Sequence, residues 1–337
     1  MANIGVVGAG SWGTALALVL EKNGHQVTLW SSREAKAKEL KELRENKEKL
    51  PGVLIPENIE ITADMETAVK GKELVVLGVP SLYIRGTAAK MAPYVHEGQM
   101  IVNVSKGIEE STLYTMTDVI AEEIPNADVA VLSGPSHAEE VSRDIPTTVV
   151  AGAKSRKTAE RIQHIFMNEA FRVYTSPDML GIEIGGALKN VIALAAGIAD
   201  GLGCGDNTKA ALITRGIAEM SRLGVAMGGY QETFSGLAGM GDLIVTCASK
   251  HSRNRKAGFL IGQGYKMQDA MNEVKMVVEG VHSAKAALRL AEKYYVRMPI
   301  IEQVNAVLFA DKPAEEAVRE LMVRDGKTEN PLLPWDK

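Results

Sequence analysis

Short apolar runs alternate with amphipathic segments through the first half of the chain. Because most of the runs are continuously apolar rather than alternating, they predict strands that are buried on both faces. Strands separated by helices predict a doubly wound, mostly parallel sheet. The runs expected to form strands are 3–8, 25–30, 59–62, 74–79, 100–105, 129–134, 147–153 and 171–176.

The segments between these runs predict helices that cover the sheet. The segment 33–49, REAKAKELKELRENKEK, is interpreted as one charged helix with a thin stripe formed by Leu40, Leu43 and Leu50. The following LPGVLIP, 50–56, is expected to be a loop between two prolines. The other helices are expected near 11–23, 64–71, 81–92, 112–124 and 155–168.

The pattern changes after Pro177. From 180 to 325 the periodicity is that of long helices, and no convincing series of strands follows. This change predicts an α/β dinucleotide-binding Rossmann domain over residues 1–180 and an all-α substrate-binding domain over residues 181–337. Because no flexible linker separates them, we expect the two domains to pack closely.

A glycine-rich turn follows the first predicted strand. The stretch VVGAGSWG places Gly8, Gly10 and Gly13 in GxGxxG spacing and opens a helix, which is the context of a dinucleotide-binding turn. The first glycine would permit the tight turn, the second would let the backbone approach a pyrophosphate, and the third would let helix and strand pack closely. The N–H groups at the helix N-terminus would bind the anion.

The end of the second predicted strand bears on the choice of cofactor. A site that prefers NADH has an acidic residue there, which binds the ribose 2′-hydroxyl. Here the chain reads Trp30-Ser31-Ser32-Arg33 and has no acid until Glu34. Ser31, Ser32 and Arg33 could instead bind a 2′-phosphate, although Arg33 could equally be a surface residue of the charged helix. We favour NADPH, with NADH possible.

A single charged residue, Lys189, lies between Glu183 and Asp200 in the segment GGALKNVIALAAGIADG. A helix lysine usually lays its stem over apolar neighbours and extends its ammonium to water. A solvated face would normally carry several charges, however, and this segment directly follows the predicted cofactor domain. We therefore expect Lys189 to transfer a proton. Burial would lower its pKa and a nearby acid would raise it, and which effect predominates stays open.

A second cluster of candidate residues lies in SGLAGMGDLIVTCASKHSRNRKAG, residues 235–258. Asp242 follows three glycines, and Lys189 is a natural partner for its charge. Ser252 stands where a helix N-cap would, which places Arg253 and Asn254 in a first helical turn. A helix N-terminus with a guanidinium is a phosphate site, although a basic run such as KHSRNRK is often only a surface patch.

Two further turns follow predicted strands of the sheet. Lys106 comes just after the strand at 100–105, and Gly134, Ser136 and His137 follow the strand at 129–134. Ligands of open α/β sheets bind beyond the carboxyl ends of the strands, so both turns are in the right place. His137 could be a general acid, but we favour a side chain that caps a turn.

The composition is that of a soluble protein with two domains: 337 residues, 46% apolar and 24% charged. The net charge of −4 gives no overall attraction to nucleic acid. Neither cysteine lies in a CxxC, and the histidines lack HExxH or HxH spacing, so no metal is expected. The chain enters a strand at once, and its apolar run at 184–199 is shorter than a membrane span, which predicts a cytoplasmic protein.

Several long stretches together resemble bacterial NAD(P)-dependent glycerol-3-phosphate dehydrogenase. They run from residue 8 to residue 281 and therefore cover most of the chain. They are GAGSWGTALA, SKGIE, LSGPSHAEEV, GGALKNVIALAAGIADGLG, GLAGMGDLIVTC, SRN and VVEGV. The resemblance implies an enzyme that interconverts dihydroxyacetone phosphate and sn-glycerol 3-phosphate and supplies glycerol phosphate for phospholipids.

The resemblance also implies roles for individual residues. Lys189 would donate or accept the proton, Asp242 would orient its ammonium, and Asn190 and Thr246 would be supporting polar groups. The residues implied to contact glycerol phosphate are Lys106, Gly134, Ser136, Lys189, Asp242, Ser252, Arg253 and Asn254. Those implied to contact the dinucleotide are Ser11, Trp12, Arg33, Lys106, Ala138, Arg253, Val277 and Glu279.

Two other functions are compatible with parts of this pattern. A β-hydroxyacid dehydrogenase also joins a Rossmann domain to a helical domain with a Lys–Asn pair, but it should not need the SRNRK phosphate site. A non-catalytic NAD(P)H sensor would need neither Lys189 nor Asp242. The oligomeric state stays open, and a homodimer is the commonest assembly.

Overall fold

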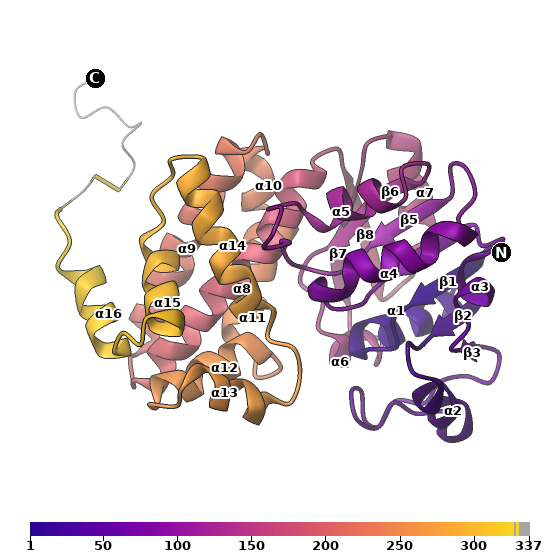
Figure 1. The fold of residues 1–337 in the computed structure, drawn as a ribbon, viewed down its shortest axis with the longest axis horizontal. Helices are drawn as coiled ribbons and strands as arrows, with labels where there is room; N and C mark the ends of the chain where they lie inside the picture. Colours follow the sequence, from indigo (N-terminus) through magenta and orange to yellow (C-terminus); the bar gives the residue numbers. More distant parts are fainter. Residues whose placement is uncertain (327, 330–337) are drawn as a thin grey trace.

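The computed structural model describes residues 1–326 and 328–329 of the chain. A sheet with its helices forms one half of the molecule, and a body of helices forms the other half beside it (Figure 1). Within the described residues every strand precedes Pro177 and the long helices follow it, as the sequence pattern predicts.

The first half is built on one sheet of eight strands in the order β3-β2-β1-β4-β5-β6-β7-β8. Neighbouring strands are parallel except for β6 and β7, which are antiparallel. This arrangement confirms the doubly wound, mostly parallel sheet. The strands are β1 Asn3–Val7, β2 Gln26–Trp30, β3 Glu60–Thr62, β4 Leu74–Leu77, β5 Met100–Asn103, β6 Asp128–Ser133, β7 Thr147–Ala153 and β8 Phe171–Ser176.

Helices cover both faces of this sheet. Successive residues of a strand point to opposite faces, so Val6 of β1 packs in the apolar cluster with α1 and α7, and Val7 packs in the cluster with α4 and α5. The helices are α1 Ser11–Lys22, α2 Glu34–Leu43, α3 Met65–Val69, α4 Ile84–Met91, α5 Met116–Glu123, α6 Ala138–Val141 and α7 Arg156–Phe166, with short 3₁₀ turns at Ser81–Tyr83 and Ala92–Tyr94.

The charged helix predicted over 33–49 is shorter than expected. It ends at Leu43, because Arg44 adopts a left-handed conformation with φ 47°. The chain then turns back, and Leu50 enters the core of the sheet half instead of lying on a helix face. Asn46 is fully buried and its Nδ2 donates to Ala9 O at 3.0 Å, which ties this loop to the glycine-rich turn.

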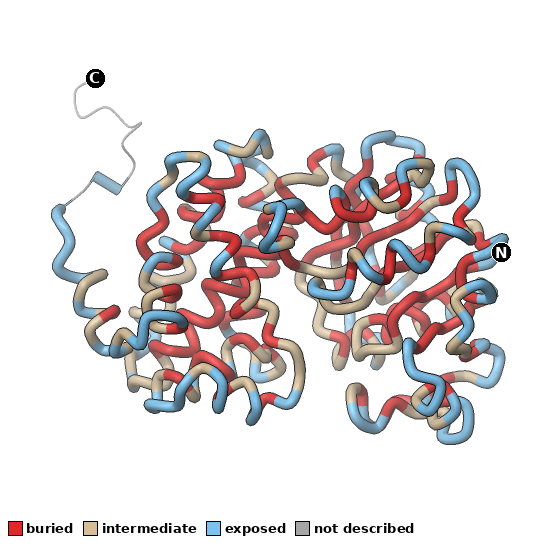
Figure 2. Tube along the Cα trace, in the orientation of Figure 1, coloured by how far each residue is buried: buried red, intermediate tan, exposed pale blue. Residues whose placement is uncertain are grey.

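The second half surrounds one long central helix, α8 (Met179–Gly201). Nearly all of α8 is buried (Figure 2). By length and composition α8 could cross a membrane, but its most apolar window lies entirely inside the protein, which is typical of a core helix. The other elements are α9 Asp206–Ala226, α10 Gln231–Ser235, a π-helical turn Leu237–Gly241, α11 Asp242–Ala248, α12 Arg253–Gly262, α13 Met267–Val274, α14 Glu279–Lys293, α15 Pro299–Phe309 and α16 Ala314–Met322.

Small residues let α12 approach α8 closely. A Cβ atom added at Gly197 would lie 2.1 Å from Arg255 O, and one added at Gly258 would lie 2.2 Å from Leu194 O. Gly197 and Gly258 therefore allow α8 and α12 to pack closely.

The two halves share an apolar seam. Ile182 near the start of α8 packs with Val131 of β6, Val150 of β7 and Ala238 of the π-helical turn. Because this cluster contains residues of both halves, the start of α8 is fixed against the sheet, in agreement with the absence of a flexible linker.

Candidate active site

The glycine-rich turn between β1 and α1 has the geometry that each glycine was expected to provide. Gly8 has φ +127°, and a Cβ atom there would lie 2.7 Å from Gly78 O. At Gly13 a Cβ atom would lie 1.9 Å from Gly8 O, so only glycine allows this helix–strand contact. Nothing lies within 4 Å of a Cβ atom at Gly10, which leaves the backbone open to a ligand.

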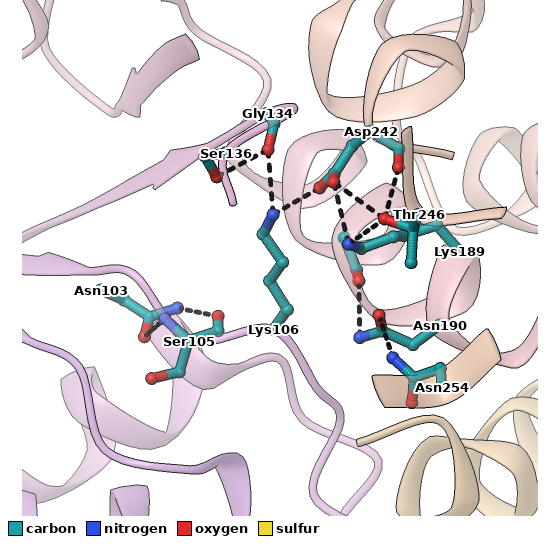
Figure 3. Close-up of polar contacts among 11 residues, drawn as sticks. Asn103, Ser105, Lys106, Gly134, Ser136, Lys189, Asn190, Asp242, Thr246 and Asn254 are labelled. Carbon is teal, nitrogen blue, oxygen red and sulfur yellow. Dashed lines mark hydrogen bonds and ion pairs between the residues drawn. The ribbon is translucent and has the colours of Figure 1, made fainter. Parts of the chain in front are cut away.

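Lys106 lies beyond the carboxyl end of β5 and points toward the helical half (Figure 3). Its Nζ donates to Gly134 O at 3.0 Å and to Asp242 Oδ2 at 2.5 Å. Ser136 Oγ donates to the same Gly134 carbonyl at 2.9 Å. The turns that follow two neighbouring parallel strands, β5 and β6, thus meet at the carboxyl ends of these strands.

Lys189 projects from α8 toward the same carboxylate (Figure 3). Lys189 is only 7% exposed, and its Nζ donates to Asp242 Oδ1 at 2.8 Å and to Thr246 Oγ1 at 2.7 Å. The Thr246 hydroxyl in turn donates to Asp242 O at 2.6 Å. Asp242 begins α11 directly after the π-helical turn, a geometry that frequently occurs at functional sites.

Two ammonium groups therefore share one buried carboxylate. Burial lowers the pKa of Lys189 to about 8, because the opposite charge of Asp242 offsets the desolvation only in part and Lys106 adds repulsion. Burial alone would raise the pKa of Asp242, but the charges of Lys106 and Lys189 lower it below its usual range. The sequence left open whether burial or the nearby acid has the larger effect on the pKa of Lys189, and in the structure the effect of burial is the larger one.

Asn190 and the start of α12 form a second polar group beside Lys189 (Figure 3). Asn254 Nδ2 donates to Asn190 Oδ1 at 2.9 Å, and Asn254 Oδ1 accepts from Gly280 N at 2.8 Å. Ser252 is the N-cap of α12 and accepts from Arg255 N, as predicted. Arg253 stands in the first turn, and no ion pair joins it to any residue that the structure describes.

His137 does not cap a turn with its side chain, contrary to expectation. It occupies the N-cap position of α6, but its ring makes no capping hydrogen bond. Its Nε2 is buried without a partner among the described residues, and so is Ser133 Oγ. Burial, followed by the charge of Lys189, lowers the pKa of His137. Such unpaired buried atoms are available to a ligand.

The remaining predicted cofactor contacts lie on both halves. Glu279 at the start of α14 accepts from Ser81 N at 3.0 Å and from Ser81 Oγ, next to the end of β4. Ala138 is buried and Val277 is half-buried. Arg33 is exposed, immediately before α2.

These residues fit a nicotinamide dinucleotide. The N-terminus of α1 carries no side-chain cap in the described structure, and the space in front of Gly10 is open. A pyrophosphate placed there would accept hydrogen bonds from backbone N–H groups. Among the described residues no group of three or more His, Cys, Asp or Glu side chains could hold a metal ion.

Comparison with known proteins agrees with this geometry. Residues 3–159 match the N-terminal profile, and residues 178–319 the C-terminal profile, of NAD-dependent glycerol-3-phosphate dehydrogenase. A curated glycerol-3-phosphate dehydrogenase [NAD(P)+] from Agathobacter rectalis is 66% identical over 99% of this chain and 100% of its own length. The chain belongs to the NAD-dependent glycerol-3-phosphate dehydrogenase family.

Other members of the family support the same assignment. The enzyme of that name from Bacillus subtilis is 53% identical, with 97% of this chain and 96% of its own covered. The crystal structure of glycerol-3-phosphate dehydrogenase from Coxiella burnetii superposes with a TM-score of 0.93 at 37% identity and covers 96% of this chain and 99% of its own. The sheet and the helical half therefore have the arrangement of this dehydrogenase family.

The glycerol-3-phosphate dehydrogenase site contains contacts that sequence reasoning missed. Lys106 was expected near substrate, but its ion pair with Asp242 was not, because 136 residues separate the two. Arg255 of the basic run is bound elsewhere: its Nη2 lies 2.7 Å from Asp200 Oδ2. The ion pair of Asp200 with Lys209, at 2.8 Å, was also not foreseen.

Proposed function

We propose that this chain reduces dihydroxyacetone phosphate to sn-glycerol 3-phosphate reversibly, with Lys189 as the proton donor and NADPH as the preferred cofactor. Residues 1–180 would hold the dinucleotide and residues 181–337 the substrate. The observation that carries the proposal is the buried Lys189 ammonium, which is held by Asp242 and Thr246 where the two halves meet.

The chemistry of the protein side chains follows from this arrangement. A bound reduced nicotinamide supplies the hydride. Negative charge grows on the carbonyl oxygen of the substrate, and the Lys189 ammonium stabilises that charge and then protonates the oxygen. Asp242 holds the ammonium in orientation through a 2.8 Å contact, and Thr246 supports it. In the reverse direction the neutral amine of Lys189 accepts the hydroxyl proton.

The start of α12 would bind the phosphate of the substrate. Arg253 has a guanidinium that no described carboxylate engages, and it lies in the first turn of a ten-residue helix. Helix N–H groups and a guanidinium together favour a phosphate dianion. Asn254 is oriented by Asn190 and Gly280, and Lys106, Ser136 and the Gly134 backbone complete the proposed contacts from the sheet half.

The preference for NADPH is supported by the end of β2. Ser31, Ser32 and the exposed Arg33 follow Trp30, and no acidic side chain stands there to bind a 2′-hydroxyl. A cationic residue at this position favours the 2′-phosphate of NADPH. Ser11 and Trp12 at the start of α1, with Ala138, Val277 and Glu279, are the remaining proposed dinucleotide contacts.

We place this activity in the cytoplasm, where it would supply glycerol phosphate for phospholipid synthesis. The net charge of −4 supports neither nucleic acid nor an anionic membrane surface as a partner. A homodimer is the expected assembly, since it is the commonest for soluble enzymes.

The decisive experiment is an initial-rate assay with dihydroxyacetone phosphate, in which NADPH and NADH are compared. We expect Lys189→Ala to lower kcat by at least about a hundredfold, the low end for general acid–base catalysis. Lys72→Ala is the matched control, because Lys72 is also 7% exposed but donates to Asn3 at the start of β1 and to Thr28 in the middle of β2. Near wild-type turnover in Lys189→Ala would remove this residue from the mechanism, and NADPH binding without ketone reduction would favour a sensor.

A further inference from the structure

Glu183 is a buried carboxyl group for which the proposed chemistry has no use. It lies in α8 and is 5% exposed. Its Oε1 accepts from Thr117 N at 2.9 Å and from Asn103 Nδ2 at 3.3 Å, and its Oε2 accepts from Thr117 Oγ1. Every one of these partners belongs to the sheet half, so the side chain joins the two halves by hydrogen bonds.

The surroundings of Glu183 are unfavourable for an ordinary packing residue. Burial raises the pKa of its carboxyl to about 7, although Thr117 lowers it in part. An apolar side chain of similar volume would avoid this desolvation. In return, Glu183 satisfies a backbone N–H at the start of α5, which intrahelical bonds leave unpaired.

From Glu183 a short run of hydrogen bonds leads to Lys106. Asn103 Nδ2, which donates to Glu183, also donates to Ser105 O at 3.0 Å. Asn103 Oδ1 accepts from Ser105 N at 3.0 Å, so the amide closes the turn after β5 (Figure 3). The next residue is Lys106, whose ammonium reaches Asp242.

Glu183 also precedes Lys189 on the same helix, α8. Six residues separate Glu183 from Lys189, about 9 Å along a helix axis at the usual rise. A shift of the start of α8 against the sheet would therefore change the distance between Lys189 and the turn that carries Lys106. Glu183 belongs to the helix that carries Lys189 and is hydrogen-bonded to Asn103, which closes the turn that carries Lys106.

We propose that Glu183 is a positioning residue that latches α8 onto the turn after β5, so that Lys106 and Lys189 meet at Asp242. The inference rests on the proposed function in taking these two lysines as the groups that contact substrate. Without the Glu183 hydrogen bonds, the Asp242 carboxylate would still bind Lys189. The turn that carries Lys106 would no longer be fixed, so Lys106 would contact Asp242 less often.

The test compares Glu183→Ala with Glu183→Gln and with a matched buried glutamate. Gln keeps Oε1 as the acceptor for Thr117 N and Asn103, and its amide can donate to Thr117 Oγ1. Glu219 is the control: it is 3% exposed, burial raises its pKa to about 7, and it accepts from Ile300 N at 3.0 Å within the helical half. Both alanine variants remove a buried helix-capping carboxylate, so a similar loss of Tm is expected.

Only the Glu183 variant should change the kinetics. We expect Glu183→Ala to raise the KM for dihydroxyacetone phosphate and to lower kcat, together at least about a hundredfold in kcat/KM, because small misplacements of catalytic groups have effects of that size. Glu183→Gln should keep kcat/KM within about fivefold of wild type, and Glu219→Ala within about twofold.

Thr117→Val extends the test if Glu183→Ala does not fold. It removes only the hydroxyl donor of the latch and should lower kcat/KM in the same direction by a smaller factor. Wild-type kcat/KM in Glu183→Ala or in Thr117→Val would overturn the positioning role alone. An equal loss of kcat/KM in Glu183→Gln and Glu183→Ala would also overturn the positioning role. If the wild-type enzyme were inactive on dihydroxyacetone phosphate, both the proposed function and the positioning role would be overturned.

Discussion

Lys189 is almost completely buried, as few lysines are, and a carboxylate partner accompanies it. A buried lysine without a partner would lose its proton at neutral pH, and a paired lysine at the surface would hold it too tightly to be useful. Here burial brings the pKa to about 8, close to the pH at which a general acid is most effective.

The pH dependence of the two reaction directions should therefore be opposite. An ammonium is needed to donate the proton, so kcat/KM for ketone reduction should fall as the pH rises through about 8. The neutral amine is needed for the oxidation of glycerol phosphate, so the kcat/KM for oxidation should rise over the same pH range. Initial rates measured across the range in both directions check this, and profiles that move in parallel would contradict the assignment.

Arg253 and its neighbour Arg255 offer a paired test of the phosphate site. Arg253→Ala should raise the KM for dihydroxyacetone phosphate by about tenfold or more, the size expected for a charge-assisted contact, with little change in kcat. The unphosphorylated dihydroxyacetone should show no such loss. Arg255→Ala breaks the ion pair with Asp200 and should lower the Tm instead of raising KM. An unchanged KM in Arg253→Ala would exclude a phosphate role.

At the scale of elements, the turn between β1 and α1 separates two functions of glycine. Gly13→Ala would place a Cβ atom 1.9 Å from Gly8 O and should lower the Tm by roughly 3 °C or more, the shift expected for at least about 1 kcal/mol. Gly10→Ala meets open space, so its Tm should match wild type while the NADPH dissociation constant rises about tenfold. Thermal melts and cofactor titration check both, and undiminished NADPH binding by Gly10→Ala would contradict the pyrophosphate site.

The order and type of the regular elements could be predicted from the apolar pattern, because strands covered on both faces and a core helix leave long apolar runs. The end of α2 could not. The polar residues after Leu43 continue a helical composition, and what stops the helix is the left-handed Arg44 and the burial of Asn46 against the glycine-rich turn. Such contacts between distant segments leave no periodic signal.

At the scale of the whole molecule, the sequence could single out candidate residues for the site better than it could predict how they meet. Lys189, Asp242 and the α12 N-terminus stand out as polar residues in unusual local settings. The sharing of Asp242 with Lys106 depends on how the helical half docks on the sheet, and no local pattern contains that information. Glu183 was passed over for the same reason: its role is visible only once Asn103 and Thr117 face it.

The shared carboxylate also has a consequence for the order in which the protein becomes active. Chains are synthesised from the N-terminus, and every strand of the sheet precedes Asp242 by more than sixty residues, since β8 ends at Ser176. The dinucleotide turn can therefore be complete while the residue that holds both lysines is still to be made. A partly synthesised chain would have the glycine-rich turn but not Asp242, so it could not hold Lys106 and Lys189 together for proton transfer until the second half has docked.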